Sequence, residues 1–247
     1  MSDYVIGRNP VLEVLKSGGP IHKILVAKGS NKGSVVEIVA RARDGRIPVQ
    51  EVERNYLDNL VPDSNHQGVA ALVPAREYVE VEDILERARG KEEDPFILIL
   101  DEIEDPHNLG AILRVADAAG VHGVIIPKRR AVGLTSAVVK ASAGAIEYVP
   151  VARVANLVQT VEKLKKEGCW VVAADMDGKV LWQSKNLSGP LACVIGSEGK
   201  GIGRLLKEKC DFLVRIPMKG QVSSLNASTA AAVLCYEILR QKESDNG

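Results

Sequence analysis

Glycines and short polar residues gather in three stretches of this 247-residue sequence, and each stretch directly follows an apolar run. In chain order they read DEIEDPHNLGAILR, GSEGKGIGR and PMKGQVSSLNAS. Continuous apolar runs are typical of buried strands in a parallel sheet, and ligand sites form at the carboxyl ends of such strands. The three stretches are therefore candidate loops of one binding site.

The last stretch lies inside Phe212 to Tyr236, where the sequence changes character twice. An apolar run ends at Pro217, a polar loop with Gly220 and Asn226 follows, and small residues then lead into a pattern of helical spacing. This order predicts a strand, a loop and a closely packed helix. A plain strand-to-helix connection with a helix cap would give the same pattern.

The glycine-rich stretch is not a nucleotide P-loop, because no Ser or Thr follows Lys200. It is not a dinucleotide fingerprint either, since it lies late in the chain and carries Glu198 within it. Its glycines still indicate that a backbone approaches something closely, either a flat ligand such as an adenosine or another backbone. These glycines are Gly196, Gly199, Gly201 and Gly203.

The first stretch offers Asn108 and Arg114, and the pattern places Asn108 near the start of a predicted helix. Asn108 could serve only as a cap, and Arg114 could be a solvated helical arginine. Apolar neighbours on both sides of Arg114 are equally compatible with a crowded setting. His107 is set aside as a general base, because nothing nearby in the sequence would orient it.

The elements that must position these loops alternate regularly. Six apolar runs and helical segments follow one another from residue 95 to the end. This alternation predicts an α/β fold with a parallel or mostly parallel sheet that is covered on both faces. Residues 1–75 read as a separate small α/β module, and residues 76–94, rich in charge, read as a linker with one helix.

Composition narrows the class of protein. Apolar residues make up 46% and charged residues 26%, and no apolar run is long enough to span a membrane, so we expect a soluble, cytoplasmic protein. The four cysteines lack metal-ligand spacing, so no metal site is expected. The net charge is zero, yet residues 1–50 carry eight Lys or Arg against four Asp or Glu. That excess could meet RNA phosphates, although a solvated face explains it as well.

Three segments together resemble a known family. HNLGAILRVADAAG, VIGSEGKGIG and IPMKGQVSSLNAS are similar, in order and spacing, to the three motifs of the SpoU (TrmH-like) branch of the SPOUT methyltransferases. The first module, with GRNPVLEVL and NHQGVAA, resembles the ribosomal protein L30e-like substrate-binding domain of many members. Judged by the VSSLN form of the third motif and by this N-terminal module, the chain most resembles the subfamily that methylates a guanosine in the peptidyl-transferase P loop of 23S rRNA.

The resemblance implies an enzyme that transfers a methyl group from S-adenosylmethionine to a ribose 2′-hydroxyl of RNA, without metal. It implies a C-terminal domain, residues 95–247, knotted as a deep trefoil, and a homodimer with the site at the subunit interface. The residues implied as catalytic are Asn108, Arg114, Glu198 and Asn226. Those implied for the cofactor are Gly196, Ile216 and Leu225, with Ala174, Gly199, Gly201, Met218, Ser224 and Ser228.

Several alternatives remain open at this point. Arg114 could steer phosphate and stabilise a developing alkoxide, or it could act as the base in a special environment, as proposed for the family. The substrate could instead be another rRNA or tRNA nucleotide, or the chain could be a non-catalytic RNA-binding protein. RNA affinity is expected from the first module, through Arg8, Asn9, Lys28, His66 and Gln67.

Overall fold

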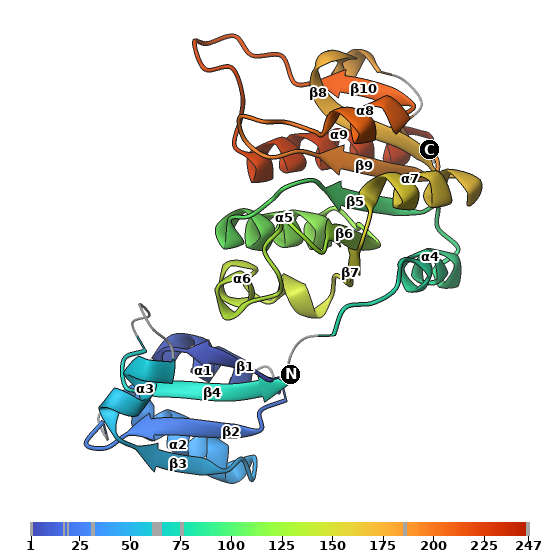
Figure 1. Ribbon diagram of the computed structural model, residues 1–247. Helices are drawn as coiled ribbons and strands as arrows, with labels where there is room; N and C mark the ends of the chain where they lie inside the picture. The colour runs from blue at the N-terminus through green and yellow to red at the C-terminus, as the bar shows by residue number, and fades with distance from the viewer. Residues whose placement is uncertain are drawn as a thin grey trace. The chain divides into compact units, whose positions relative to one another are not determined.

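The computed structural model describes residues 2–16, 18, 20–30, 33–60, 66–74, 77–184 and 187–245. The chain divides into two compact units, Met1–Glu77 and Tyr78–Gly247 (Figure 1). Each unit has its own sheet and its own buried core. Within the described ranges, no helix combines the length and the apolar character that a membrane span requires.

The first unit is a four-stranded sheet in the order β1-β4-β2-β3, with helices packed on both faces. β4 is antiparallel to both of its neighbours, whereas β2 and β3 are parallel. The sequence pattern did not predict β1, a short edge strand whose partner β4 lies far along the chain. The elements are β1 (Ser2–Ile6), α1 (Arg8–Lys16), β2 (Lys23–Ala27), α2 (Ser34–Asp44), β3 (Val49–Val52), α3 (Arg54–Leu60) and β4 (Val69–Pro74).

The second unit contains a six-stranded sheet in the order β10-β8-β9-β5-β6-β7, and every pair in it is parallel. This confirms the predicted α/β class. Its elements are α4 (Val81–Gly90), β5 (Phe96–Leu100), α5 (Pro106–Ala118), β6 (Gly123–Pro127), α6 (Ser136–Ala141), β7 (Val151–Val154), α7 (Leu157–Lys166), β8 (Trp170–Val180), β9 (Leu191–Ile195), α8 (Arg204–Lys209), β10 (Phe212–Arg215) and α9 (Ala227–Asp245), with short 3-10 turns at Ala145–Glu147 and Leu181–Gln183.

The central strand β5 shows why these strands are apolar throughout. Phe96, Leu98 and Leu100 pack on one face with residues of α5, α6 and α9. Ile97 and Ile99 pack on the other face with residues of α4, α7 and α8. Because successive side chains of a strand point to opposite faces, a sheet covered on both sides needs an apolar residue at every position.

Helix α4 belongs to the second unit and is not part of a linker. Val81, Ile84, Leu85 and Ala88 of this helix are buried in the core on one face of the sheet. The expected linker over residues 76–94 is therefore corrected for residues 81–90. The segment carries many charges because only one stripe of the helix is buried, and its exposed side is polar.

The carboxyl ends of the parallel strands meet along one edge of the sheet, so the loops that follow β5, β6, β9 and β10 share that edge (Figure 1). Strand β10 pairs with β8 in two separate registers. Leu213 lies opposite Ala173, whereas the next residue, Val214, lies opposite Lys179. Residues 174–178 therefore bulge out of the ladder. The trefoil knot implied by the family resemblance stays a prediction.

His122 lies at the other edge of this sheet, where it is 2% exposed. The amide of Phe96 donates to its Nδ1 over 3.0 Å, and its Nε2 lies 3.0 Å from Oε2 of Glu93. Since Nδ1 accepts a hydrogen bond, the proton of the neutral ring sits on Nε2. Burial lowers the pKa of His122, and the opposing effect of Glu93 is smaller.

We expect the free energy of unfolding of the second unit to fall between pH 7.5 and 5.5. The unfolded chain takes up a proton at His122 near a pKa of about 6.5, whereas the folded ring resists protonation, so acid favours unfolding. Fluorescence during urea unfolding follows this unit alone, because both tryptophans, Trp170 and Trp182, lie in it. The variant His122→Asn keeps an acceptor and cannot titrate, so it should lose less stability over this range. An equal loss in both proteins would contradict the assignment.

Candidate active site

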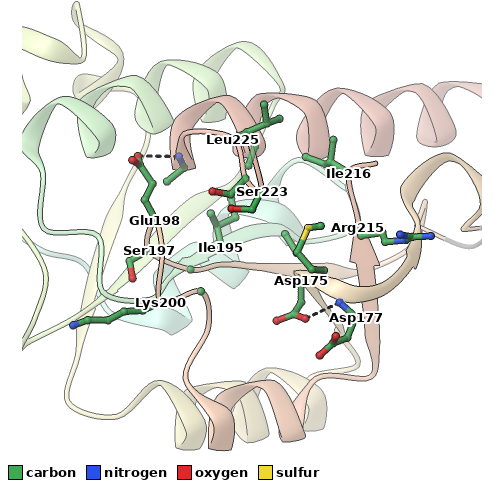
Figure 2. Close-up of a pocket in the computed structure, with 18 of the residues that line it drawn as sticks. Asp175, Asp177, Ile195, Ser197, Glu198, Lys200, Arg215, Ile216, Ser223 and Leu225 are labelled. Atoms are coloured by element: carbon green, nitrogen blue, oxygen red, sulfur yellow. Dashed lines mark hydrogen bonds between the residues drawn. The ribbon is translucent and has the colours of Figure 1, made fainter. Parts of the chain in front are cut away.

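A cavity of about 400 Å³ opens at the carboxyl edge of the second unit's sheet (Figure 2). It is built from residues 174–177 of β8, the loop after β9, the loop after β10 and the start of α9. The predicted cofactor residues that line it are Ala174, Gly196, Gly199, Gly201, Ile216, Met218, Ser224 and Leu225, together with Glu198. Ser228 does not line it.

The glycine-rich loop forms a tight turn against the cavity. The amide of Gly201 donates to the carbonyl of Ser197 over 2.9 Å, and Gly199 and Gly201 have φ angles of +83° and +69°. Gly196 packs against the backbone of Gly201 and Ile202, where the chain leaves this turn. A Cβ atom at Gly196 would sit 2.3 Å from the carbonyl carbon and oxygen of Gly201. The absence of a side chain at Gly196 is thus what lets the turn close.

Three of the four expected catalytic residues form one hydrogen-bonded network at the cavity's edge. Oε1 of Glu198 accepts from Nδ2 of Asn108 (3.0 Å), Nδ2 of Asn226 (2.6 Å) and the amide of Ala227 (3.2 Å). The two asparagines also meet directly, with Nδ2 of Asn226 2.8 Å from Oδ1 of Asn108. Each residue comes from a different motif, so the network ties the three motifs together.

The caps of the two helices explain these positions. Asn226 caps α9, because its Oδ1 accepts from the amide of Ser228 (2.9 Å) and from the Ser228 hydroxyl (2.5 Å). Asn108 was expected near the cap of α5, but that cap is Asp105, whose Oδ1 accepts from the amide of His107. Asn108 is the third residue of the helix, and its side chain is free to bind Glu198.

Arg114 lies apart from this network. It is exposed on α5, does not line the cavity, and makes no hydrogen bond or ion pair with any residue that the structure describes. The structure thus brings Asn108, Glu198 and Asn226 together but does not bring Arg114 to them within one chain.

Two further groups of the cavity were missed or only partly foreseen. Nζ of Lys207 lies 2.7 Å from Oδ1 of Asp175 and 2.6 Å from Oδ2 of Asp177 (Figure 2 shows both carboxylates opposite Glu198). Burial alone would raise the pKa of Asp175, but the bonds from Lys207 and from the Asp177 amide lower it. Asp175 follows Ala174, which was expected to contact the cofactor, whereas no sequence signal pointed to Lys207 of α8.

The residues expected to contact RNA lie in the first unit. Arg8 binds Gln67 twice, through its amide to Oε1 (3.3 Å) and through Nε to the carbonyl (3.0 Å). Asn9 is exposed, and Lys28 is paired with Glu53 at 2.6 Å. His66 is buried, with Nε2 2.8 Å from Asp58 and Nδ1 accepting from the amide of Gly68. His66 therefore holds its loop, and its side chain does not face solvent.

Comparison with known proteins covers both units. The SpoU rRNA Methylase family matches residues 95–236, and the domain described as RNA 2′-O ribose methyltransferase substrate binding matches residues 4–79. The Bacillus subtilis protein YacO, named as a TrmH family tRNA/rRNA methyltransferase, is 53% identical over 97% of this chain and 96% of its own.

Solved structures agree. The SpoU methyltransferase AviRb from Streptomyces viridochromogenes, crystallised with the cofactor AdoMet, matches with a TM-score of 0.80 and 26% identity over 98% of this chain and 91% of its own. An rRNA methyltransferase from Sinorhizobium meliloti matches with a TM-score of 0.73 and 27% identity over 97% and 87%. With its cavity, its three converging motifs and these matches along nearly its whole length, the chain belongs to the SpoU family of S-adenosylmethionine-dependent RNA 2′-O-methyltransferases.

Proposed function

We propose that this enzyme methylates the ribose 2′-hydroxyl of a guanosine in the peptidyl-transferase P loop of 23S rRNA, and that it works in the cytoplasm as a homodimer. The observation that carries the methyl transfer is the network of Asn108, Glu198 and Asn226 beside the cavity, whereas the choice of target rests on the VSSLN form of the third motif. It places a carboxylate and two amides, suited to binding ribose hydroxyls, next to a space of cofactor size.

The cavity fits S-adenosylmethionine. Its volume of about 400 Å³ lies within the range usual for small-molecule sites. Ile195, Ile216 and Leu225 give it apolar walls for a flat base, while Asp175 and Glu198 can face hydroxyl or cationic groups. Ser197 also belongs to the cavity's lining, and its hydroxyl is buried with no partner among the described residues. When bound, the cofactor supplies an activated methyl group on a sulfonium.

One carboxylate oxygen of this network can still bind the substrate. All three donors converge on Oε1 of Glu198, and Oε2 has no partner within the described part of the chain. A ribose hydroxyl can therefore donate to Oε2 and be held in a fixed direction. Because Asn108 and Asn226 lock the carboxylate, this alignment costs little ordering at the moment of reaction.

Arg114 completes the site from the other subunit in this proposal. Its guanidinium is exposed and unpaired in the described chain, as a residue that serves a partner's cavity would be. There it either stabilises the developing alkoxide and the neighbouring phosphate, or accepts the hydroxyl proton in an environment that makes it less basic. A dimer with its sites at the interface makes either role possible.

The first unit supplies RNA affinity and target choice. Arg8, Asn9 and Gln67 lie at one end of its sheet. The two hydrogen bonds from Arg8 to Gln67 hold these two residues together there. Lys28 adds a charge that Glu53 already orients. We assign His66 a positioning role for Gln67 and leave it out of the RNA contacts.

Mapping of 2′-O-methylated nucleotides tests the proposal. Large-subunit rRNA from a strain lacking the gene should lose one methylated guanosine in the P loop, and restoring the gene should return it. Mass spectrometry of digested rRNA and tRNA from the same strains tests the alternatives. Loss at another rRNA or a tRNA nucleotide would replace the target, and no loss in either RNA would leave a non-catalytic RNA-binding role.

A further inference from the structure

Glu102 and Arg130 both hold left-handed backbone, and they pair with each other. Their φ angles are 56° and 55°, and Nη1 of Arg130 lies 2.7 Å from Oε1 of Glu102. Residues other than glycine, asparagine and aspartate rarely adopt this backbone conformation. An ion pair whose arginine is 74% exposed adds little stability, so stability does not account for this geometry. Strained residues of this kind gather at functional sites.

The pair is joined to the active-site cavity through Lys200. Nζ of Lys200 lies 3.4 Å from the second oxygen of Glu102, and Lys200 itself lines the cavity. Figure 2 shows its side chain extending on the side of Glu198, away from Asp175. Glu102 follows β5 and Arg130 lies in the turn after β6, so one carboxylate holds two cations at the carboxyl edge of the sheet.

The turn that carries Arg130 is basic and anchored. Lys128, Arg129 and Arg130 are consecutive and exposed. The carbonyl of Lys128 accepts from Nη2 of Arg153, whose guanidinium lies over the ring of Tyr78. The turn therefore presents its charges from a fixed backbone.

The acidic residues of the facing loop offset part of this charge. Asp101 accepts the amide of Gly203 over 2.8 Å, and Asp105 caps α5. Glu102 is shared between Arg130 and Lys200, and the charges of Glu104 and Asp101 add to the effect of Glu102 that raises the pKa of Arg130. These carboxylates keep their charge, so an RNA phosphate has to compete with Glu102 for Arg130 and Lys200.

We propose that Arg130 and Lys200, held by Glu102, form a clamp for the phosphates of the RNA strand that flank the target ribose at the cavity's mouth. The clamp rests on the proposed function. Arginine binds phosphate with a planar fork and lysine with a point charge, and both pairs in the protein are exposed enough to exchange for phosphate. Phosphate contacts fix the position of a nucleic acid and not its sequence, so the clamp acts on RNA affinity.

The test compares Arg130→Ala, Lys200→Ala and the double variant with Arg89→Ala. Arg89 pairs with Glu167 at the same 2.7 Å and is 62% exposed, so it is a matched ion pair away from the cavity. With a transcript of the P-loop region of large-subunit rRNA, Arg130→Ala should raise KM for RNA by about tenfold and leave kcat and cofactor affinity nearly unchanged. Each lost phosphate contact should reduce the slope of the logarithm of the RNA binding constant against the logarithm of the salt concentration by about 0.7. Arg130→Lys should recover part of the RNA affinity, because lysine keeps the charge.

The outcomes separate this inference from the proposed function. A wild-type enzyme that transfers no methyl group to the transcript contradicts the proposed function. An active wild type in which Arg130→Ala behaves as Arg89→Ala overturns the clamp. A loss confined to kcat, with KM and the salt slope unchanged, overturns it as well, because that pattern indicates a disturbed cavity.

Discussion

Gly196→Ala is expected to weaken S-adenosylmethionine binding by about tenfold to a hundredfold while the chain stays folded. The new Cβ would lie 2.3 Å from the carbonyl of Gly201 and 2.6 Å from the amide of Ile202, both of which are backbone atoms. Overpacking against backbone forces a displacement and costs about 1–3 kcal/mol. Here the displaced segment is the cavity wall itself, so the cost falls on the shape of the site.

Gly189→Ala is the matched control, since nothing lies within 4 Å of a Cβ at that position. Calorimetry with S-adenosylmethionine should show wild-type affinity for Gly189→Ala and this weaker affinity for Gly196→Ala. Circular dichroism and urea unfolding should show that both variants keep their sheet. Equal cofactor affinity in the two variants would mean that the cavity is not the cofactor site.

The alternation of apolar runs and helices sufficed to predict the second unit's sheet, because strands covered on both faces are apolar at every position. The boundaries of individual strands and helices were harder to predict from the sequence. One of the six apolar runs, EYVPV, has the composition of a strand from residue 147 on, but Ala145–Glu147 forms a 3-10 turn and β7 begins at Val151. Pro150 has no amide to donate, so the ladder starts after it.

Chain order alone was enough to predict that the three motifs meet at one site. Loops that follow parallel strands must share one edge, so the three motifs were expected together. Contacts made across the fold were not predictable. Asn108 and Glu198 lie 90 residues apart, and nothing in the sequence shows that Asn108 binds this carboxylate and does not cap its helix. The same holds for Lys207, which meets Asp175 only because the tertiary fold brings α8 to the cavity.

Arg114→Lys is expected to lose at least about a hundredfold of turnover, with cofactor binding unchanged and RNA binding only slightly weaker. Lysine keeps the charge and loses the planar fork, and a misplacement of about 1 Å can cost on the order of a hundredfold in rate. Single-turnover methyl transfer at saturating RNA and cofactor measures the step. Arg87→Lys, at another exposed helical arginine, is the control. A rate within a few-fold of wild type would remove Arg114 from the proposed catalytic residues.

Mixed dimers decide whether Arg114 acts across the subunit interface of the proposed homodimer. Arg114→Lys chains keep an intact cavity, and Gly196→Ala chains keep an intact Arg114 beside a cavity with weakened cofactor binding. If Arg114 serves the partner's cavity, a dimer of one chain of each kind has one complete site and should recover about half of the wild-type turnover per dimer. If Arg114 serves its own chain's cavity, no site in the mixed dimer is complete, and its rate should stay at the level of the two inactive parents. The exposed, unpaired guanidinium of Arg114 in the described chain favours the first result.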